Sequence, residues 1–144
     1  MALLGQEAVG VSNPQDDMAE LLQAAEQAQK MAYAPYSSFP VGAAVLAADG
    51  TIYAGCNVEN ASYGLTICAE RNAIAHAVSC GSQHFTAVAV VTDNGVTPCG
   101  ACRQVLAEFG SQMTVIVADT RGNRQIYSLA ELLPQAFGPA QLQK

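Results

Sequence analysis

The sequence predicts an α/β domain in which one sheet is covered by helices on both faces. Helical and strand-like segments alternate along the chain, in the order α-ββ-α-β-α-ββ-α. Two apolar, β-branched runs, residues 85–91 and 113–118, are typical of strands buried on both faces. Two pairs of strand-like segments are separated by connections too short for a parallel crossover. The length of 144 residues favours a single domain.

The first half of the chain predicts a helix followed by a hairpin. Residues 13–31 carry a helix start, with Asn13 as N-cap, Pro14 at the first position and acidic residues in the first turn. Residues 41–47 and 51–58 are strand-like, and the Asp49-Gly50 pair between them is a hairpin signal.

The second half alternates helix and strand. The predicted elements are a helix from near Cys68 to Gly81, a strand over 85–91, a helix from about Cys99 to Phe109 and a strand over 113–118. Residues 119–124 are too few and too polar for a crossover, so the strand at 125–127 should pair antiparallel with its predecessor. Ser128 and Glu131 form a capping-box pattern that opens a short helix ending at Pro134.

The two ends of the chain and its amino-acid composition indicate how the protein is divided and whether it forms oligomers. Residues 1–12 are expected to be a mobile tail, residues 13–138 a single domain and residues 139–144 a C-terminal tail. The chain is 51% hydrophobic and only 12% charged, about half the usual charged share. A homo-oligomer that buries apolar surface between subunits is therefore expected, with a poorly soluble monomer as the alternative.

The net charge and the targeting signals of the sequence limit the kinds of partner and the location that are expected. The net charge is −6 and no cluster of basic residues is present, which argues against a nucleic-acid partner and favours a small neutral molecule. Neither a signal peptide nor a membrane span is predicted, so no membrane partner is expected and the cytoplasm is the expected location. The five cysteines there would be metal ligands or buried thiols rather than disulfides.

Three cysteines and a glutamate indicate a catalytic metal site. Cys99 and Cys102 lie three residues apart in a predicted helix, on one face, and Cys68 begins another helix. Three protein ligands leave a tetrahedral zinc with one open position. Glu70 is two residues from Cys68, so it points away from the ligand direction and could move protons for a zinc-bound water.

Each of these residues also has a plainer interpretation. C-x-x-C alone could be a redox pair or half of a structural zinc site, and a glutamate in a first helical turn often only complements the helix dipole. His76 lies about 12 Å along the helix from Cys68, too far to join the site. His84 lies at the opposite end of its helix–strand unit from Cys99, and Cys56 and Cys80 are interpreted as buried small side chains.

Arg71 adjoins the predicted metal site, where its positive charge is expected to offset the negative charge of the thiolates. Three thiolates on zinc leave a net charge of −1, which raises the pKa of the metal-bound water. The positive ends of the two helices that begin at Cys68 and Cys99 oppose this effect. Arg71 could donate a hydrogen bond to one or more sulfurs and support the thiolates in the same way.

Several motifs in order resemble one enzyme family. Zinc deaminases carry a metal ligand two residues before a glutamate, then P-C-x-x-C. Cys68-Ala69-Glu70 with Pro98-Cys99-Gly100-Ala101-Cys102 reproduces the all-cysteine form, and residues 33–44, 55–63 and 131–137 are also similar. Over roughly residues 16–138 the chain resembles the small homotetrameric zinc-dependent cytidine deaminases.

The resemblance implies a fold, a reaction and a set of contacts. It implies a three-layer α/β/α fold with a mixed five-stranded sheet, one Zn²⁺ per subunit, a homotetramer with shared active sites and a role in pyrimidine salvage. Cys68, Cys99 and Cys102 would bind the metal, while Glu70 would carry protons from water to N3 and to the leaving amine of cytidine or deoxycytidine. The implied substrate-binding residues are Phe39, Asn57, Glu59, Ala61, Tyr63, Ala69, Thr97 and Phe137.

The individual contacts follow from the same resemblance. Phe39 would stack on the base, and Asn57 and Glu59 would hold the 3′-hydroxyl, where a carboxylate would repel a phosphate. The amide of Ala69 would contact the pyrimidine O2 and the carbonyl of Thr97 the amine. Tyr63 and Phe137 would reach the site from neighbouring subunits. From the residues alone, Asn57 and Glu59 could simply end a strand, and Phe137 could anchor the C-terminus in the core.

Two rival functions remain open at this point. A blasticidin-type deaminase shares the cysteine and glutamate core, although the Asn57 to Asn60 stretch, Arg71 and Phe137 favour cytidine. A structural zinc or redox module would explain the cysteines, but it would not explain Glu70 or the residues expected at the ribose.

Overall fold

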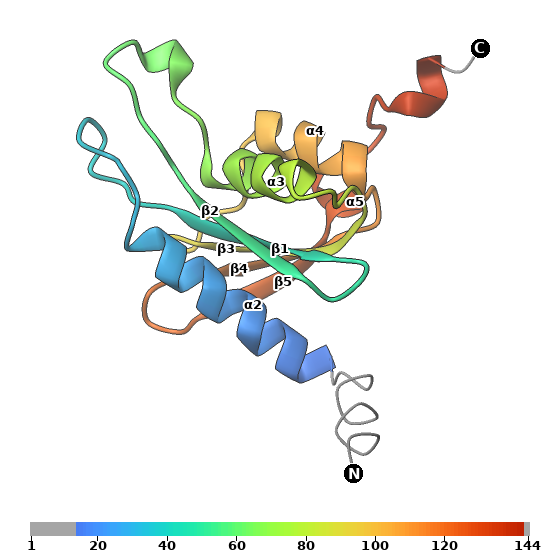
Figure 1. Cartoon of the computed structure of the whole chain (residues 1–144), viewed down its shortest axis with the longest axis horizontal. Coiled ribbons are helices and arrows are strands. Elements are labelled where there is room, and N and C mark those ends of the chain that lie inside the picture. Colours follow the sequence, from blue (N-terminus) through green and yellow to red (C-terminus); the bar gives the residue numbers. More distant parts are fainter. Residues whose placement is uncertain (1–13, 143–144) are drawn as a thin grey trace.

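A five-stranded mixed sheet separates two helical layers in the computed structural model, which describes residues 14–142 (Figure 1). The strands are β1 (Gly42–Ala47), β2 (Ile52–Cys56), β3 (Phe85–Val91), β4 (Thr114–Ala118) and β5 (Arg124–Ser128). Their order in the sheet is β2-β1-β3-β4-β5; β3 and β4 are parallel and every other neighbouring pair is antiparallel.

The helices divide between the two faces of the sheet. They are α2 (Pro14–Gln29), α3 (Ala69–Ser79), α4 (Gly100–Phe109) and the single turn α5 (Leu129–Leu132), with 3₁₀ turns at Tyr63–Leu65 and Pro139–Leu142. Figure 1 shows α2 on one face and α3 and α4 side by side on the other. None of the helices described within residues 14–142 is long and apolar enough to cross a bilayer.

The predicted α/β architecture is confirmed, including the antiparallel last pair, in which Ile116 lies opposite Ile126. The capping box at Ser128 is also present, because Ser128 accepts from the Ala130 amide and Glu131 accepts from the Ser128 amide. Asn13 and the expected tail at residues 1–12 lie outside the described residues, as do residues 143–144.

Several element boundaries differ from the sequence prediction by one or two residues. The first helix ends at Gln29 rather than Met31, and the second strand ends at Cys56 rather than Val58. The chain leaves β2 at Asn57, whose amide nitrogen still bonds to the Val41 carbonyl at 3.2 Å. The alternation of apolar residues continues past that point, but Val58 only forms isolated bridges to residues outside the sheet.

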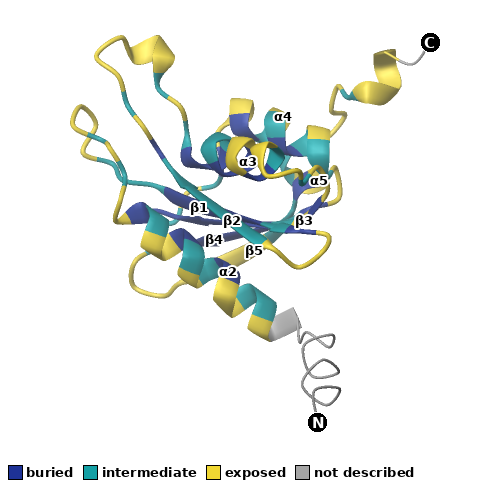
Figure 2. Ribbon diagram, in the orientation of Figure 1, coloured by how far each residue is buried: buried dark blue, intermediate teal, exposed yellow. Residues whose placement is uncertain are grey.

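The sheet carries a hydrophobic core on each face, because successive side chains of a strand point to opposite sides. Ala43, Val45 and Val88 pack in the core beneath α3 and α4, whereas Ala44 and Ala89 pack against α2 in the other core. Figure 2 shows that the inner strands are buried while the outer faces of the helices are exposed. The buried central strands thus form a rigid platform for both helical layers.

Small residues let the helices approach the sheet closely. A Cβ at Gly42 on β1 would overlap the carbonyl oxygen of Ala25 in α2. Glycine is needed there for the close approach rather than for an unusual backbone angle. The core beneath α3 is similarly made of small side chains, with Ala69, Ala73 and Ala77 fully buried.

Candidate active site

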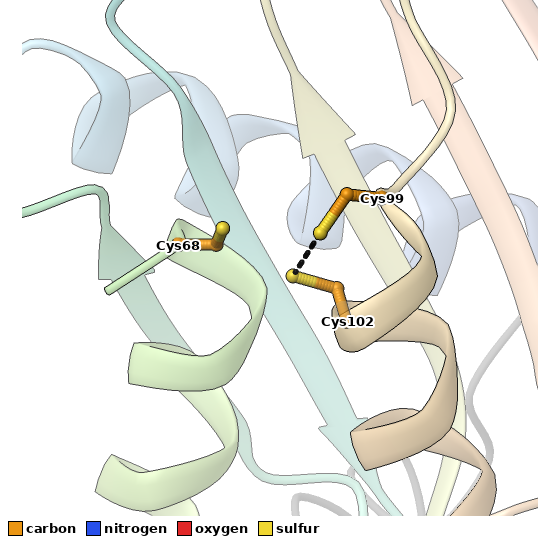
Figure 3. Close-up of side chains that lie close together, drawn as sticks. All are labelled: Cys68, Cys99 and Cys102. Carbon is orange, nitrogen blue, oxygen red and sulfur yellow. Dashed lines mark hydrogen bonds between the residues drawn. The ribbon is translucent and has the colours of Figure 1, made fainter. Parts of the chain in front are cut away.

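Three thiols meet where α3 and α4 begin. Cys68 is the N-cap of α3, Cys99 is the N-cap of α4, and Cys102 lies in the first turn of α4 (Figure 3). Their Sγ atoms all lie within 4.8 Å of one another, and the Sγ atoms of Cys99 and Cys102 are 3.5 Å apart. The helix packing therefore brings Cys68 next to two cysteines that lie more than thirty residues later in the sequence.

The donor set fits a tetrahedral metal ion. Zn–S bonds of about 2.3 Å in a tetrahedron place ligand sulfurs about 3.8 Å apart, close to the separations found here. Neither Cys68 nor Cys99 uses its side chain to cap its helix, so both thiols are available as ligands. Within residues 14–142, these three cysteines form the group of side chains whose ligand atoms are close enough to share one metal ion. Three protein ligands leave the fourth tetrahedral position open.

The surroundings favour a thiolate at Cys68. The pKa of Cys68 is lowered to about 5, first because Cys102 donates a hydrogen bond to its sulfur and further because Arg71 faces it. The same hydrogen bond and burial raise the pKa of Cys102. A deprotonated sulfur is the form that binds metal.

Arg71 contacts the first ligand, as the sequence predicted. Its Nη2 donates to Sγ of Cys68 at 3.8 Å and to the carbonyl oxygen of Thr66 at 3.3 Å. The Thr66 carbonyl holds the guanidinium beside the sulfur. The positive charge of Arg71 and the N-termini of both helices thus act on the same cluster of thiols.

A cavity of about 260 Å³ opens directly beside these thiols. Its walls come from the segment before β1, the residues that follow β2, the start of α3, the end of β3 and the turn before α4. It is lined by Ser37, Phe39, Val41, Asn57, Glu59, Thr66, Cys68, Ala69, Glu70, Val90, Thr92, Val96, Thr97 and Cys99. A mostly apolar hollow with a few polar groups is typical of a small-molecule site.

Glu70 reaches the cavity from the first turn of α3. It is only 4% exposed, and burial raises the pKa of its carboxyl group, with a further rise from the thiolate of Cys68. A carboxyl group with a raised pKa can both take and return a proton near neutral pH. The buried carboxyl group of Glu70 therefore lines the same cavity as the thiols of Cys68 and Cys99.

Asn57 and Glu59 both line the cavity, and both also hold the chain in place. Asn57 accepts from the Val41 amide at 2.9 Å and donates to the Phe39 carbonyl at 2.9 Å. Its side chain thus fixes the segment that carries Phe39. Each amide atom retains capacity for one more hydrogen bond.

Glu59 anchors the loop at residues 36–37. Its carboxylate accepts from the amides of Tyr36 at 2.9 Å and Ser37 at 3.2 Å, and from the Ser37 hydroxyl. The hydroxyl of Ser37 makes the largest contribution to lowering the pKa of Glu59, and these two amides lower it further. The carboxyl group of Glu59 is therefore an anion. The interpretation that Asn57 and Glu59 only terminate a strand is too narrow, since both face the cavity.

The turn between β3 and α4 forms one wall of the cavity. Thr92 is 1% exposed, and its hydroxyl accepts from the amides of Gly95 at 2.8 Å and Val96 at 3.2 Å. This shapes the turn so that Val96 and Thr97 line the hollow. Ser37, Thr66, Thr92 and Val96 were missed by the sequence analysis, because loop residues without periodicity give no local signal of a shared cavity.

Three predicted contact residues lie outside this cavity. Ala61 and Tyr63 are exposed on the loop between β2 and α3, and Phe137 is 56% exposed near the C-terminus. Tyr63 packs on Tyr36, with ring centroids 5.8 Å apart, at the rim of an adjoining hollow that also includes Glu59. Within one chain, therefore, Tyr63 borders the site and Phe137 does not line the cavity.

The remaining histidine and cysteine predictions have mixed outcomes. His76 is exposed, and its Nδ1 lies 3.0 Å from the Ala54 carbonyl oxygen, away from the thiols. Neither histidine belongs to the metal-binding group, as expected. Cys80 is exposed and Cys56 only half-buried, so the prediction that both are buried is wrong. Cys80 follows α3 at the surface, where the chain turns through Gly81.

Comparisons with known proteins agree with this geometry. Residues 15–118 match the family described as the cytidine and deoxycytidylate deaminase zinc-binding region. The cytidine deaminase of Sporosarcina psychrophila is 50% identical over 129 residues, which cover 88% of this chain and 95% of that protein. The cytidine deaminase of Halalkalibacterium halodurans is 50% identical over 124 residues, which cover 84% and 94% of the two chains.

A solved structure supports the same relationship in three dimensions. The crystal structure of cytidine deaminase from Burkholderia pseudomallei superposes with a TM-score of 0.80 at 47% identity. The match covers 83% of this chain and 98% of that one. The sheet and both helical layers are therefore shared.

Proposed function

Because this chain belongs to the cytidine and deoxycytidylate deaminase family, we propose that it is a cytidine deaminase. It converts cytidine and deoxycytidine, with one water, to uridine and deoxyuridine plus ammonia. The observation that carries this proposal is the cavity in which the buried Glu70 stands beside three converging thiols. A structural zinc site has no need of an adjoining cavity or of a buried carboxyl group with a raised pKa.

The metal in this proposal is one Zn²⁺ per chain, held by Cys68, Cys99 and Cys102. When bound, zinc supplies a Lewis acid that makes a water molecule in its open position more acidic. The chain supports this with the Arg71 hydrogen bond to Cys68 and with the N-termini of α3 and α4. These positive groups offset the charge that three thiolates add.

Glu70 moves the protons. It takes one from the water and delivers it to N3 of the cytosine ring, while the oxygen adds to C4. It then carries the second proton of that water to the exocyclic amine, and the C4–N bond breaks to release ammonia. A buried carboxyl group with a raised pKa suits both directions of transfer.

The base and the sugar are held by different walls of the cavity. Phe39 stacks on the pyrimidine, the amide of Ala69 contacts O2, and the carbonyl of Thr97 contacts the leaving amine. Asn57 and Glu59 bind the 3′-hydroxyl with the hydrogen-bonding capacity that their loop contacts leave free. The carboxylate of Glu59 disfavours a phosphate at that end, so the substrate is the free nucleoside.

The working assembly is a homotetramer in which neighbours complete each site. Exposed apolar side chains on one chain include Tyr33 (55%), Tyr63 (74%), Leu65 (64%) and Phe137 (56%). Burying them between subunits removes apolar surface that a lone chain would expose to water. Ala61, Tyr63 and Phe137 make their substrate contacts in that assembly. We place the enzyme in cytoplasmic pyrimidine salvage, where thiols remain reduced.

A turnover assay with three substrates tests the proposal. Purified zinc-loaded protein is incubated with cytidine, deoxycytidine and blasticidin S, and both loss of absorbance and release of ammonia are followed. Turnover of the two nucleosides is the expected result. Turnover of blasticidin S alone would mean that blasticidin S, and not a cytosine nucleoside, is the substrate. If a protein with one zinc per chain turned over none of the three compounds, the deaminase function would be refuted.

A further inference from the structure

Arg103 joins the wall of the cavity to the C-terminal part of the chain. It follows the ligand Cys102 on α4 and is half-buried. Its Nε donates to the Pro98 carbonyl at 2.7 Å, one Nη to the Thr97 hydroxyl at 2.9 Å and the other to the Leu132 carbonyl at 2.7 Å. One guanidinium thus binds two residues of the turn before α4 and the end of α5.

The contacts require the shape of the guanidinium. All three partners are neutral oxygens, so the interaction is a set of directed hydrogen bonds rather than an ion pair. The planar fork of arginine presents its donors at fixed angles, whereas a lysine ammonium at the end of a flexible stem is a compact point charge. A lysine at this position could satisfy only part of the set.

The two turn residues held by Arg103 sit directly before the site. Thr97 lines the cavity, and Pro98 precedes the ligand Cys99. Arg103 thus holds the Thr97 side chain and the Pro98 carbonyl, which lie on either side of the peptide that leads from Thr97 towards Cys99. The neighbouring Gln104 donates to the Phe137 carbonyl at 2.8 Å, so α4 also holds the C-terminal segment.

We propose that Arg103 is a positioning residue for the reaction: it holds the turn at Thr97 and Pro98 so that the Thr97 carbonyl and the Cys99 thiol keep their working orientation. The part that concerns turnover rests on the proposed deaminase function. The part that concerns Cys99 does not, since it predicts the geometry of the metal site itself. The competing view is that Arg103 merely attaches α5 to α4 through Leu132.

Two substitutions and one control distinguish these views. Arg103→Met keeps an unbranched apolar stem without any donor, and Arg103→Lys keeps the charge without the fork. Arg124→Met is the matched control, because Arg124 is exposed on β5 and does not line the cavity. Each protein is loaded with Co²⁺, whose visible spectrum reports the arrangement of its thiolate ligands. Release of the metal to a chelator, kcat and KM for cytidine are then measured.

The positioning role predicts a specific pattern. In Arg103→Met the Co²⁺ bands shift, the chelator removes the metal faster, and kcat falls by about 100-fold with little change in KM. Arg103→Lys gives a smaller shift of the Co²⁺ bands and a smaller loss of kcat. This variant also provides the test if Arg103→Met does not fold. The control behaves as the wild type.

The opposite pattern overturns the inference. If both Arg103 variants have the wild-type Co²⁺ spectrum and kcat, and differ only in thermal stability, Arg103 is a structural link to α5. If the wild type itself does not turn over cytidine, the deaminase proposal fails. The spectra and the release rates would still decide whether Arg103 orients Cys99.

Discussion

Gly55 of β2 lies directly against the backbone of Ala73 in α3: a Cβ at Gly55 would be 2.5 Å from the Ala73 nitrogen and 2.8 Å from the carbonyl carbon of Asn72. Both are main-chain atoms, so no side chain can move aside to make room. The absence of a side chain at one position of an edge strand therefore sets how closely α3 packs on the sheet. Because α3 begins after Cys68 and carries Glu70, this packing also sets the position of the Glu70 carboxyl group.

Replacing Gly55 by alanine should displace α3 and weaken the fold. We expect the free energy of unfolding to fall by about 1 to 3 kcal/mol, since overpacking against a backbone cannot relax through a rotamer change. Turnover should fall as well, because Glu70 moves with α3. Denaturant titration measures the first effect. Gly64→Ala is the control, since a Cβ there would meet no atom within 4 Å; equal stability of both variants would contradict the prediction.

Replacing Glu70 by glutamine should abolish turnover and leave the metal in place. Glutamine has the same shape but cannot take a proton from water, so kcat for cytidine should fall by about 100- to 10,000-fold. Metal analysis should still find the metal content of the wild type. Glu108→Gln, an exposed substitution on α4, is the control. Substantial activity in Glu70→Gln would remove Glu70 as the proton carrier.

The same substitution should stabilise the metal-free protein at neutral pH. Burial raises the pKa of Glu70 above its ordinary value of 4.5, so the folded state binds more protons there than the unfolded state. The stability of the wild type therefore falls as pH rises from that value through the folded pKa. Denaturant titrations across pH should show Glu70→Gln gaining over the wild type as pH rises, with no gain at low pH. A constant difference would contradict this linkage.

Removing the charge of Arg71 should shift metal binding to higher pH. Arg71 helps to lower the pKa of Cys68, which is about 5, after the larger effect of Cys102. In Arg71→Gln that pKa rises, protons compete better with the metal, and the midpoint of metal uptake moves upward. The pKa that governs turnover should rise in parallel. Arg124→Gln is the control, and uptake curves that superpose for both variants would refute the role.

Mixed assemblies should reveal whether neighbouring subunits share a site. Glu70→Gln and Phe137→Ala are each expected to be inactive or weak alone. In a tetramer containing both, a chain with intact Glu70 can receive Phe137 from its neighbour, so co-expression should restore part of the activity. Light scattering reports the mass of the assembly. Activity equal to the mean of the two separate variants would mean that Phe137 acts within its own chain or not at all.

Local patterns in the sequence were sufficient for most of the fold. The Asp49-Gly50 hairpin, the buried strand at 85–91 and the capping box at Ser128 depend on neighbouring residues, and all three are found in the structure. The short connection at 119–124 similarly excluded a crossover. The end of β2 was misplaced because leaving the sheet at Asn57 depends on contacts with Val41, which no local pattern records.

The metal site was predictable for the same reason. Cys99 and Cys102 share a helix face, and the Cys68-Ala69-Glu70 motif places the carboxylate away from the ligand direction. Spacing along a helix is a local property, so the sequence indicated that these cysteines could share a metal ion, and the structure brings their thiols together. Cys80, by contrast, was wrongly placed in the core, because exposure depends on which elements pack over a helix end.

Short-range periodicity and motifs were enough to predict the helices and strands, the cluster of three cysteines and the resemblance to one family. Three features could be learned only from the folded chain: Arg103 binds Thr97, Pro98 and Leu132, Asn57 and Glu59 each contact a loop and line the cavity, and Glu70 is deeply buried. Hydrogen-bond partners and burial arise when distant segments pack together. Arg103 and Leu132 are separated by 29 residues, and no rule of local spacing connects them.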